Sequence, residues 1–263
     1  MSNRIDEKFA QLKAQNKKAL ITYISAGDGG LELTEKAVLE MEKNGADIIE
    51  IGVPFSDPIA EGPVIQEASL RSLRDYHTTL KSVFEMVKKL RTQTDMPLLL
   101  MLYANTVFRT PDFFDKCHEV GIDGVIIPDL PFEEHDEFKQ AAEKNNIYNI
   151  SLVTPASTGR IEKIAPAAQG FLYCVSSVGV TGMRDKFDTD FNAFFNEIKK
   201  YAKIPCCVGF GIRNGEAAQK MGSYCDGVIV GSAVVNQIGQ YQQEALPHVA
   251  ALCQELRTGL DKI

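Results

Sequence analysis

Short runs of apolar, largely β-branched residues recur along the whole chain and alternate with amphipathic segments. The amphipathic segments have a helical period: in residues 80–91 the apolar positions are spaced by three and four, and residues 191–201 repeat this pattern. The apolar runs are continuous, which is typical of strands covered by helices on their outer side. We predict eight strands, at residues 19–25, 47–53, 97–102, 124–128, 147–153, 170–176, 204–209 and 227–230.

Eight strands that alternate with helices indicate parallel pairing with right-handed crossovers. Each unit has about 33 of the 263 residues, which fits an α/β fold of the (β/α)8 TIM-barrel type. An extra N-terminal helix, at residues 5–16, could close the bottom of the barrel. Because no linker or change in composition divides the chain, we expect residues 1–263 to form a single TIM-barrel domain. The alternative is a doubly wound open sheet, which eight regular units disfavour.

Three aspartates, Asp47, Asp123 and Asp226, each follow a turn and directly precede a predicted strand. Aspartate at such a position commonly stabilises a turn through its side chain. We therefore interpret these three residues as structural.

The composition is that of a folded protein, with 44% hydrophobic residues and a formal charge of −7. The negative charge and the lack of a basic stripe argue against nucleic-acid binding. The six cysteines form no C-x-x-C pair, and the four histidines are not at metal-ligand spacing. The N-terminus lacks the apolar stretch of a signal peptide, and the apolar runs are too short to span a bilayer. We expect a cytoplasmic protein without a metal site or membrane contact.

Glu50 lies inside the second predicted strand, between Ile49 and Ile51. A carboxylate in a strand covered on both sides is unfavourable unless it is paired or protonated. One interpretation is a buried ion pair with a Lys or Arg. The other is a carboxyl group with a raised pKa that faces the barrel mouth and transfers protons. Gly52, two residues further on, would leave room for a ligand.

The loop at residues 54–63 follows this strand and is stiffened by three prolines. It contains two acids, Asp57 and Glu61. Asp57 could instead cap a turn, and Glu61 could be an ordinary surface residue. Together with Glu50, however, a carboxyl group in a rigid loop suggests an acid and a base with separated pKa values.

Turns that contain glycine follow the last three predicted strands, at the end of the barrel where ligands bind. They lie at residues 176–182, 209–212 and 230–233. Backbone N–H groups in such turns can bind phosphate oxygens, and Ser232 could also cap the helix that follows. No G-x-x-x-x-G-K-[ST] loop is present, and no predicted strand contains a lysine for Schiff-base chemistry. These features favour acid–base chemistry on a small phosphorylated molecule without a cofactor.

Several segments resemble the tryptophan synthase α subunit family. They are E-I-G-V-P-F-S-D-P at residues 50–58, A-E-G-P-V-I-Q at 60–66, the turn at 176–182 that ends in G-V-T-G, and G-F-G-I at 209–212. The resemblance implies a TIM barrel that cleaves indole-3-glycerol phosphate to indole and glyceraldehyde 3-phosphate and carries no cofactor. It also implies a partner, the pyridoxal-phosphate-dependent β subunit, in an α2β2 heterotetramer.

By this resemblance, Glu50 moves a proton between indole C3 and the glycerol hydroxyl, and Glu61 stabilises positive charge at the indole nitrogen. Glu61 stands where the family has an aspartate, and a displacement of about 1 Å can cost about a hundredfold in rate. The implied substrate contacts are Tyr23, Met101, Tyr173, Thr181, Gly182, Phe210, Gly211, Gly231 and Ser232. Of these, Tyr23, Met101 and Phe210 could instead be ordinary core residues. The implied partner contacts are Pro54, Asp57 and Asn105.

The segment from residue 177 to about 189 contains Thr181 and Gly182 and is expected to close over a bound ligand. Three alternatives to a lyase that works with a β subunit remain open. The chain could be a catalytically weakened barrel that mainly binds and activates the β subunit, or a free-standing lyase that releases indole. It could also be a phosphosugar isomerase, although the P-F-S-D-P segment would then have no role.

Overall fold

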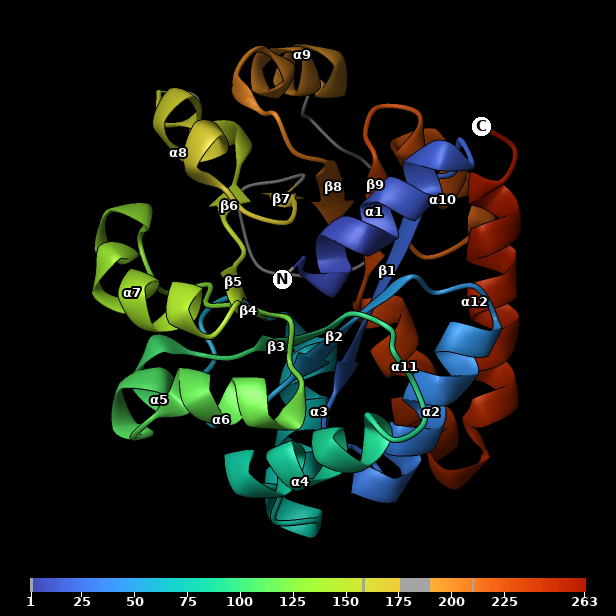
Figure 1. Cartoon of the computed structure of the whole chain (residues 1–263). Coiled ribbons are helices and arrows are strands. Elements are labelled where there is room, and N and C mark those ends of the chain that lie inside the picture. Colours follow the sequence, from blue (N-terminus) through green and yellow to red (C-terminus); the bar gives the residue numbers. More distant parts are fainter. Residues whose placement is uncertain (1, 158, 176–189, 210) are drawn as a thin grey trace.

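Nine parallel strand segments form a closed barrel in the computed structural model, which describes residues 2–157, 159–175, 190–209 and 211–263 (Figure 1). Their order in the sheet is β5-β4-β3-β2-β1-β9-β8-β7-β6. The segments at the two ends of this order, β5 and β6, are separated in the chain only by Ile150 and Ser151. The fifth predicted strand therefore closes the barrel, since its first half pairs with β4 and its second half with β7.

The strand bounds agree with the predicted runs to within two residues among the described positions, apart from the split of the fifth strand. The segments are β1 Ala19–Ser25, β2 Ile48–Gly52, β3 Leu98–Met101, β4 Gly124–Ile126, β5 Tyr148–Asn149, β6 Leu152–Val153, β7 Leu172–Val175, β8 Cys206–Gly209 and β9 Gly227–Val230. The closed parallel order confirms the TIM barrel and excludes the doubly wound open sheet.

Helices surround the barrel and cover the outer side of the strands (Figure 1). They are α1 Arg4–Ala14, α2 Leu31–Lys43, α3 Pro63–Asp75, α4 Leu80–Leu90, α5 Ala104–Arg109, α6 Phe113–Val120, α7 Asp136–Lys144, α8 Ile161–Ala167, α9 Phe191–Tyr201, α10 Gly215–Gly222, α11 Ser232–Tyr241 and α12 Leu246–Leu260. Short 3-10 turns lie at η1 Phe132–Glu134, η2 Pro155–Ser157 and η3 Gln242–Glu244. No helix in the described part of the chain combines the length and the apolar character needed to cross a membrane.

Some of the helices begin at a capping side chain. The Thr79 hydroxyl accepts a hydrogen bond from the Ser82 backbone N–H at the start of α4, and the Asp190 carboxylate accepts one from Ala193 at the start of α9. The apolar residues of both helices then recur at helical spacing and are buried against the barrel.

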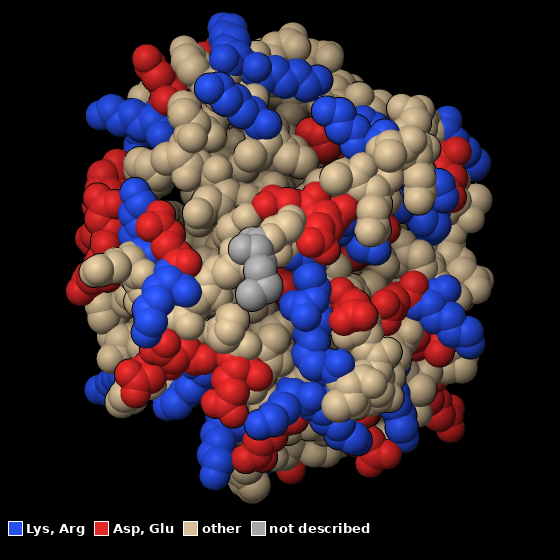
Figure 2. Space-filling model, in the orientation of Figure 1, with Lys and Arg blue, Asp and Glu red and all other residues tan. Residues whose placement is uncertain are grey.

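Helix α1 closes the bottom of the barrel, as predicted. Its Ile5, Phe9 and Leu12 side chains are buried in the same apolar cluster as the inward-facing residues of the strands. The ring of Phe9 lies 5.8 Å from that of Phe171, measured between centroids. On the face of the molecule shown in Figure 2, acidic and basic side chains of the described residues are interspersed and do not form separate patches.

The three aspartates that precede strands each join the start of one strand to the start of its neighbour. Each carboxylate accepts a hydrogen bond from a backbone N–H of the preceding strand in the barrel. The acceptors Asp47, Asp123 and Asp226 lie 2.8, 2.9 and 2.9 Å from the nitrogens of Leu20, Leu98 and Cys206, respectively. Their structural interpretation is therefore confirmed, and the acids left over for chemistry are those at the barrel mouth.

Candidate active site

Glu50 points into the barrel from β2. Ile48, two residues earlier in the strand, belongs to the interior cluster, and alternation along the strand places Glu50 on the same inner side. The residue directly opposite it on β1 is Tyr23, and the one on β3 is Leu99. Only 1% of the Glu50 surface is exposed. Its carboxyl group therefore lies in the barrel interior.

No basic side chain in the described part of the chain compensates this buried carboxyl group. Among the described residues, nothing hydrogen-bonds to Glu50 Oε1 and no Lys or Arg forms an ion pair with the carboxyl group. Burial alone raises the pKa of Glu50 to about 8. The interpretation of a buried ion pair is therefore wrong for the described part of the chain. At neutral pH Glu50 carries a proton that it can donate.

Two tyrosines lie beside Glu50, and each needs a glycine on the next strand. A Cβ atom at Gly52 would lie 2.0 Å from the hydroxyl oxygen of Tyr23, and one at Gly209 would lie 2.6 Å from that of Tyr173. The expectation that Gly52 leaves room for a ligand is thus wrong, because the Tyr23 ring occupies that space. Met101, at the end of β3, packs against Tyr23. Three of the predicted substrate contacts, Tyr23, Met101 and Tyr173, therefore line the barrel interior.

Glu61 is also buried at the mouth, with 6% of its surface exposed, so it is not a surface residue. The Tyr103 hydroxyl donates a hydrogen bond to Glu61 Oε2 and accepts hydrogen bonds from the backbone N–H groups of Ile59, at 2.9 Å, and Ala60, at 3.1 Å. Burial raises the pKa of Glu61, while the hydrogen bond from Tyr103 lowers it. The two acids therefore differ in environment, since Glu50 has no hydrogen-bond partner among the described residues whereas Glu61 is hydrogen-bonded. The predicted separation of their pKa values stays a prediction.

Tyr103 holds the loop that contains Glu61 through its hydrogen bonds, and this role was not predicted from the sequence. Its ring stacks on Phe55 at a centroid distance of 4.8 Å. Next to it, the backbone N–H of Ala104 donates to the Asp129 carboxylate at 2.9 Å, which ties the end of β3 to the loop after β4. Tyr103 follows β3 at the carboxyl end of the barrel, and this position was the available signal.

Glu50 and Glu61 both raise the pKa of the same tyrosine, Tyr23. Burial raises the pKa of Tyr23 above its ordinary value, and the nearby carboxyl groups of Glu61 and Glu50 raise it further. This shared electrostatic influence shows that both acids lie near Tyr23 at the carboxyl ends of β1 and β2. The Tyr23 hydroxyl stays protonated there and has the Ser25 hydroxyl as its neighbour, at 3.4 Å.

Two of the three predicted phosphate-binding turns follow β8 and β9, which are adjacent strands, and the turn at residues 176–182 lies outside the described residues. Gly211 has a φ of 76°, a left-handed conformation that favours glycine. Gly231 is the N-cap of α11, and Ser232 is the first residue of that helix, so its backbone N–H is one of those left free at the helix start. The expectation that the Ser232 side chain caps α11 is wrong. Thr181, Gly182 and Phe210, together with the segment 177–189, lie outside the described residues.

The predicted partner contacts lie in the segments that follow β2 and β3 at the same end of the barrel, with Asn105 in α5. Asp57 and Asn105 are exposed, whereas Pro54 is buried. The Asp57 carboxylate accepts a hydrogen bond from the Ser56 hydroxyl. Two large apolar side chains nearby in the sequence, Ile59 and Phe108, are 70% and 53% exposed. Their exposure was not predicted from the sequence, because the sequence pattern of a loop or a short helix does not distinguish a buried apolar residue from an exposed one.

Comparisons with known proteins agree with this geometry. The sequence profile of the family described as "Tryptophan synthase alpha chain" matches residues 9–261. The chain is 47% identical to the tryptophan synthase alpha chain of Alkaliphilus metalliredigens over 90% of each chain, and 43% identical to that of a Thermoanaerobacter species over 97% of this chain and 98% of the other. The crystal structure of the tryptophan synthase alpha chain from Legionella pneumophila matches with a TM-score of 0.91 at 36% identity, covering 100% and 99% of the two chains.

The raised pKa of Glu50 predicts a pH-dependent stability that Glu50→Gln removes. The folded protein holds a proton that the unfolded chain, with its ordinary value of 4.5, releases. The stabilisation is therefore complete below pH 4.5 and is lost as the pH rises through about 8. Urea unfolding should show that the wild type loses ~2 kcal/mol or more relative to Glu50→Gln over this interval. A stability difference between the two proteins that does not change with pH would contradict this assignment.

Proposed function

This chain belongs to the tryptophan synthase alpha chain family, and from that premise we propose that it is the lyase that cleaves indole-3-glycerol phosphate to indole and glyceraldehyde 3-phosphate. The observation that carries the proposal is the unpaired, buried Glu50, whose pKa of about 8 keeps it protonated at neutral pH. We also propose that residues 1–263 act as one domain, because the barrel is closed at the bottom by α1 and its outer layer extends to α12.

In the proposed reaction, Glu50 donates its proton to C3 of the indole ring. The ring then carries a positive charge and accepts the electron pair of the bond between C3 and the glycerol chain as that bond breaks. The hydroxyl group on the adjacent glycerol carbon becomes the aldehyde and gives its proton to the Glu50 carboxylate, so that the enzyme returns to its starting state. One group can serve as acid and then as base because its pKa lies near the working pH.

Glu61 is proposed to stabilise the positive charge that develops at the indole nitrogen. Its Oε2 atom accepts the Tyr103 hydrogen bond, and a carboxylate has further lone pairs with which to accept the indole N–H. Glutamate is one methylene longer than the aspartate of the family. We infer that Tyr103, held in turn by the backbone of Ile59 and Ala60, fixes the longer side chain in a productive position.

The phosphate of the substrate is proposed to bind at Gly211, Gly231 and Ser232, where the start of α11 supplies backbone N–H groups and a favourable helix dipole. The other proposed contributors, Thr181, Gly182 and Phe210, complete the set implied by the resemblance. No step of this reaction requires a cofactor on this chain. A tryptophan synthase β subunit is the proposed partner, in an α2β2 heterotetramer.

Substitution of Glu50 tests the reaction. Glu50→Gln keeps the shape of the side chain but removes its acidic proton. The rate of indole release should therefore fall at least about a hundredfold while substrate binding persists. Glu67→Gln, an exposed residue of α3, is the matched control and should retain wild-type turnover. Indole release should be measured with the chain alone and with a β subunit added.

Each outcome of this assay has a clear meaning. Wild-type turnover in Glu50→Gln would contradict the proposed chemistry. No indole release by the wild type in either condition, together with stimulation of the β subunit, would favour a binding and activating role. Strong activity of the isolated chain without any stimulation would favour a free-standing lyase.

The exposed apolar residues at the barrel mouth predict where the β subunit binds. Large apolar side chains that lose water on binding contribute most of the affinity of an interface. Phe108→Ser and Ile59→Ser should each weaken binding of the β subunit about tenfold or more, as measured by calorimetric titration. Leu70→Ser is the control, because Leu70 is also 55% exposed but lies on α3. Equal effects of all three substitutions would contradict this location.

A further inference from the structure

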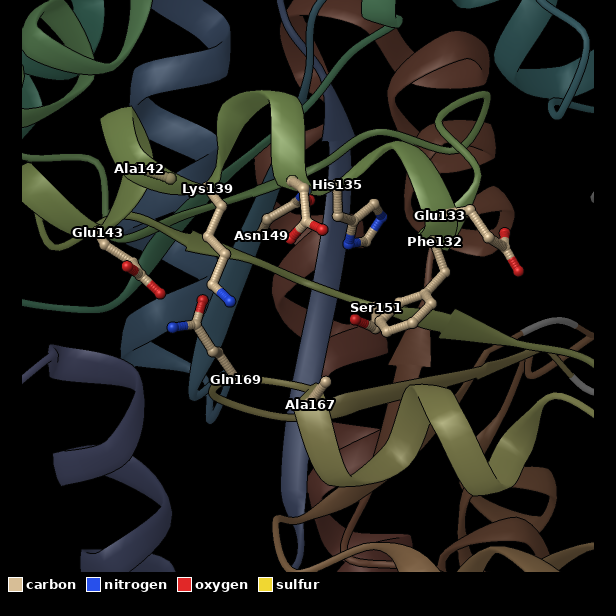
Figure 3. Close-up of a pocket in the computed structure, with 11 residues that line it drawn as sticks. Phe132, Glu133, His135, Lys139, Ala142, Glu143, Asn149, Ser151, Ala167 and Gln169 are labelled. Carbon is tan, nitrogen blue, oxygen red and sulfur yellow. The ribbon is translucent and has the colours of Figure 1, made fainter.

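A polar cavity lies on the outer flank of the barrel, away from the residues assigned to the proposed reaction. Its volume is about 290 Å³. One wall is formed by η1 and α7 and the other by the end of α8 and Gln169, and residues of the fifth predicted strand form its floor (Figure 3). None of the described residues that line it is assigned to the proposed reaction.

The cavity exists because the fifth strand carries polar residues on its outer side. Ile150 and Leu152 face the barrel interior, so Asn149 and Ser151 face the helices. On the neighbouring strands β4 and β7 the outward positions carry apolar residues such as Val125 and Leu172, which pack into the core. At the equivalent positions, Asn149 and Ser151 supply polar groups in place of apolar ones.

The floor of the cavity contains a polar atom without a partner. Asn149 Oδ1 is buried and makes no hydrogen bond to any described residue. Buried amide oxygens in folded proteins are almost always hydrogen-bonded, and leaving one unpaired is unfavourable. A bound molecule that donates an N–H group to Asn149 would remove this cost.

The walls carry charges of both signs that are not already paired. Lys139 and Glu143 both line the cavity and lie one helical turn apart on α7, yet neither forms an ion pair with any described residue. The Lys139 side chain extends across the cavity towards Gln169 (Figure 3). At the cavity's other end the rings of Phe132 and His135 lie 5.5 Å apart. Burial lowers the pKa of His135, which favours its uncharged form.

We propose that this flank cavity binds a free α-amino acid. The ammonium group faces the Glu143 carboxylate and donates to Asn149 Oδ1, which turns towards the ligand from its buried position. The carboxylate of the ligand pairs with Lys139, and its side chain lies against Phe132 and His135. A zwitterion fits because the walls offer both charges. A phosphate ester or a nucleic acid is disfavoured, because Glu133, Asp136 and Glu143 would repel it. The volume is at the lower end of the range for small-molecule sites, which suits a ligand of this size.

Calorimetric titration of the full chain with each of the common amino acids tests the proposal. At least one should bind with a dissociation constant near or below about 1 mM. Glu143→Gln and Asn149→Leu should weaken its binding about tenfold or more, because each removes a partner of the ammonium group. Glu137→Gln, on the same helix but outside the cavity, should bind as the wild type does.

A stability measurement separates loss of the site from loss of the fold. Asn149→Leu replaces the unpaired amide by an apolar group of similar shape, so its midpoint of urea unfolding should be equal to or higher than that of the wild type. The proposal is overturned if no amino acid binds to the wild type. It is also overturned if Glu143→Gln and Asn149→Leu, folded as the wild type is, bind the ligand with unchanged affinity.

Discussion

The proposed chemistry of this barrel depends on one constraint, which is the burial of the Glu50 carboxyl group without a counter-charge from the described residues. Transfer of an ionised carboxylate from water into a protein interior is strongly unfavourable, so a buried acid without a partner keeps its proton. The remaining inner surface reinforces this state. Apolar residues surround the base of Glu50, α1 closes the bottom of the barrel, and the two neighbouring tyrosines have hydroxyls that stay neutral.

The second carboxyl group shows how one scaffold can give two buried acids different surroundings. Glu61 comes from a loop rather than a strand, and it is held by the Tyr103 hydroxyl, which in turn is fixed by backbone N–H groups of the same loop. Such a hydrogen bond favours the ionised form, whereas the surroundings of Glu50 favour the protonated form. The different roles proposed for the two acids therefore depend on their positions in the barrel and not on residue type.

The sequence predicted most of the architecture because the fold depends on features that are local along the chain. Continuous apolar runs marked the strands, helical spacing marked α4 and α9, and the aspartates before strands were correctly interpreted as structural. Contacts between distant segments were not accessible in the same way. Neither the packing of Tyr23 over Gly52 nor the hydrogen bond from Tyr103 to Glu61 leaves a periodic signal, since each joins residues far apart in sequence that meet only when the barrel closes. The split of the fifth strand likewise depends on closure.

Infrared difference spectroscopy gives the most direct test of whether Glu50 is protonated in the folded protein. The spectrum of the wild type minus that of Glu50→Gln isolates this one side chain from the other buried acids. At neutral pH the difference should contain the carbonyl stretch of a protonated carboxylic acid, and this band should disappear as the pH rises through about 8. A difference spectrum that shows only an ionised carboxylate at neutral pH would contradict the account.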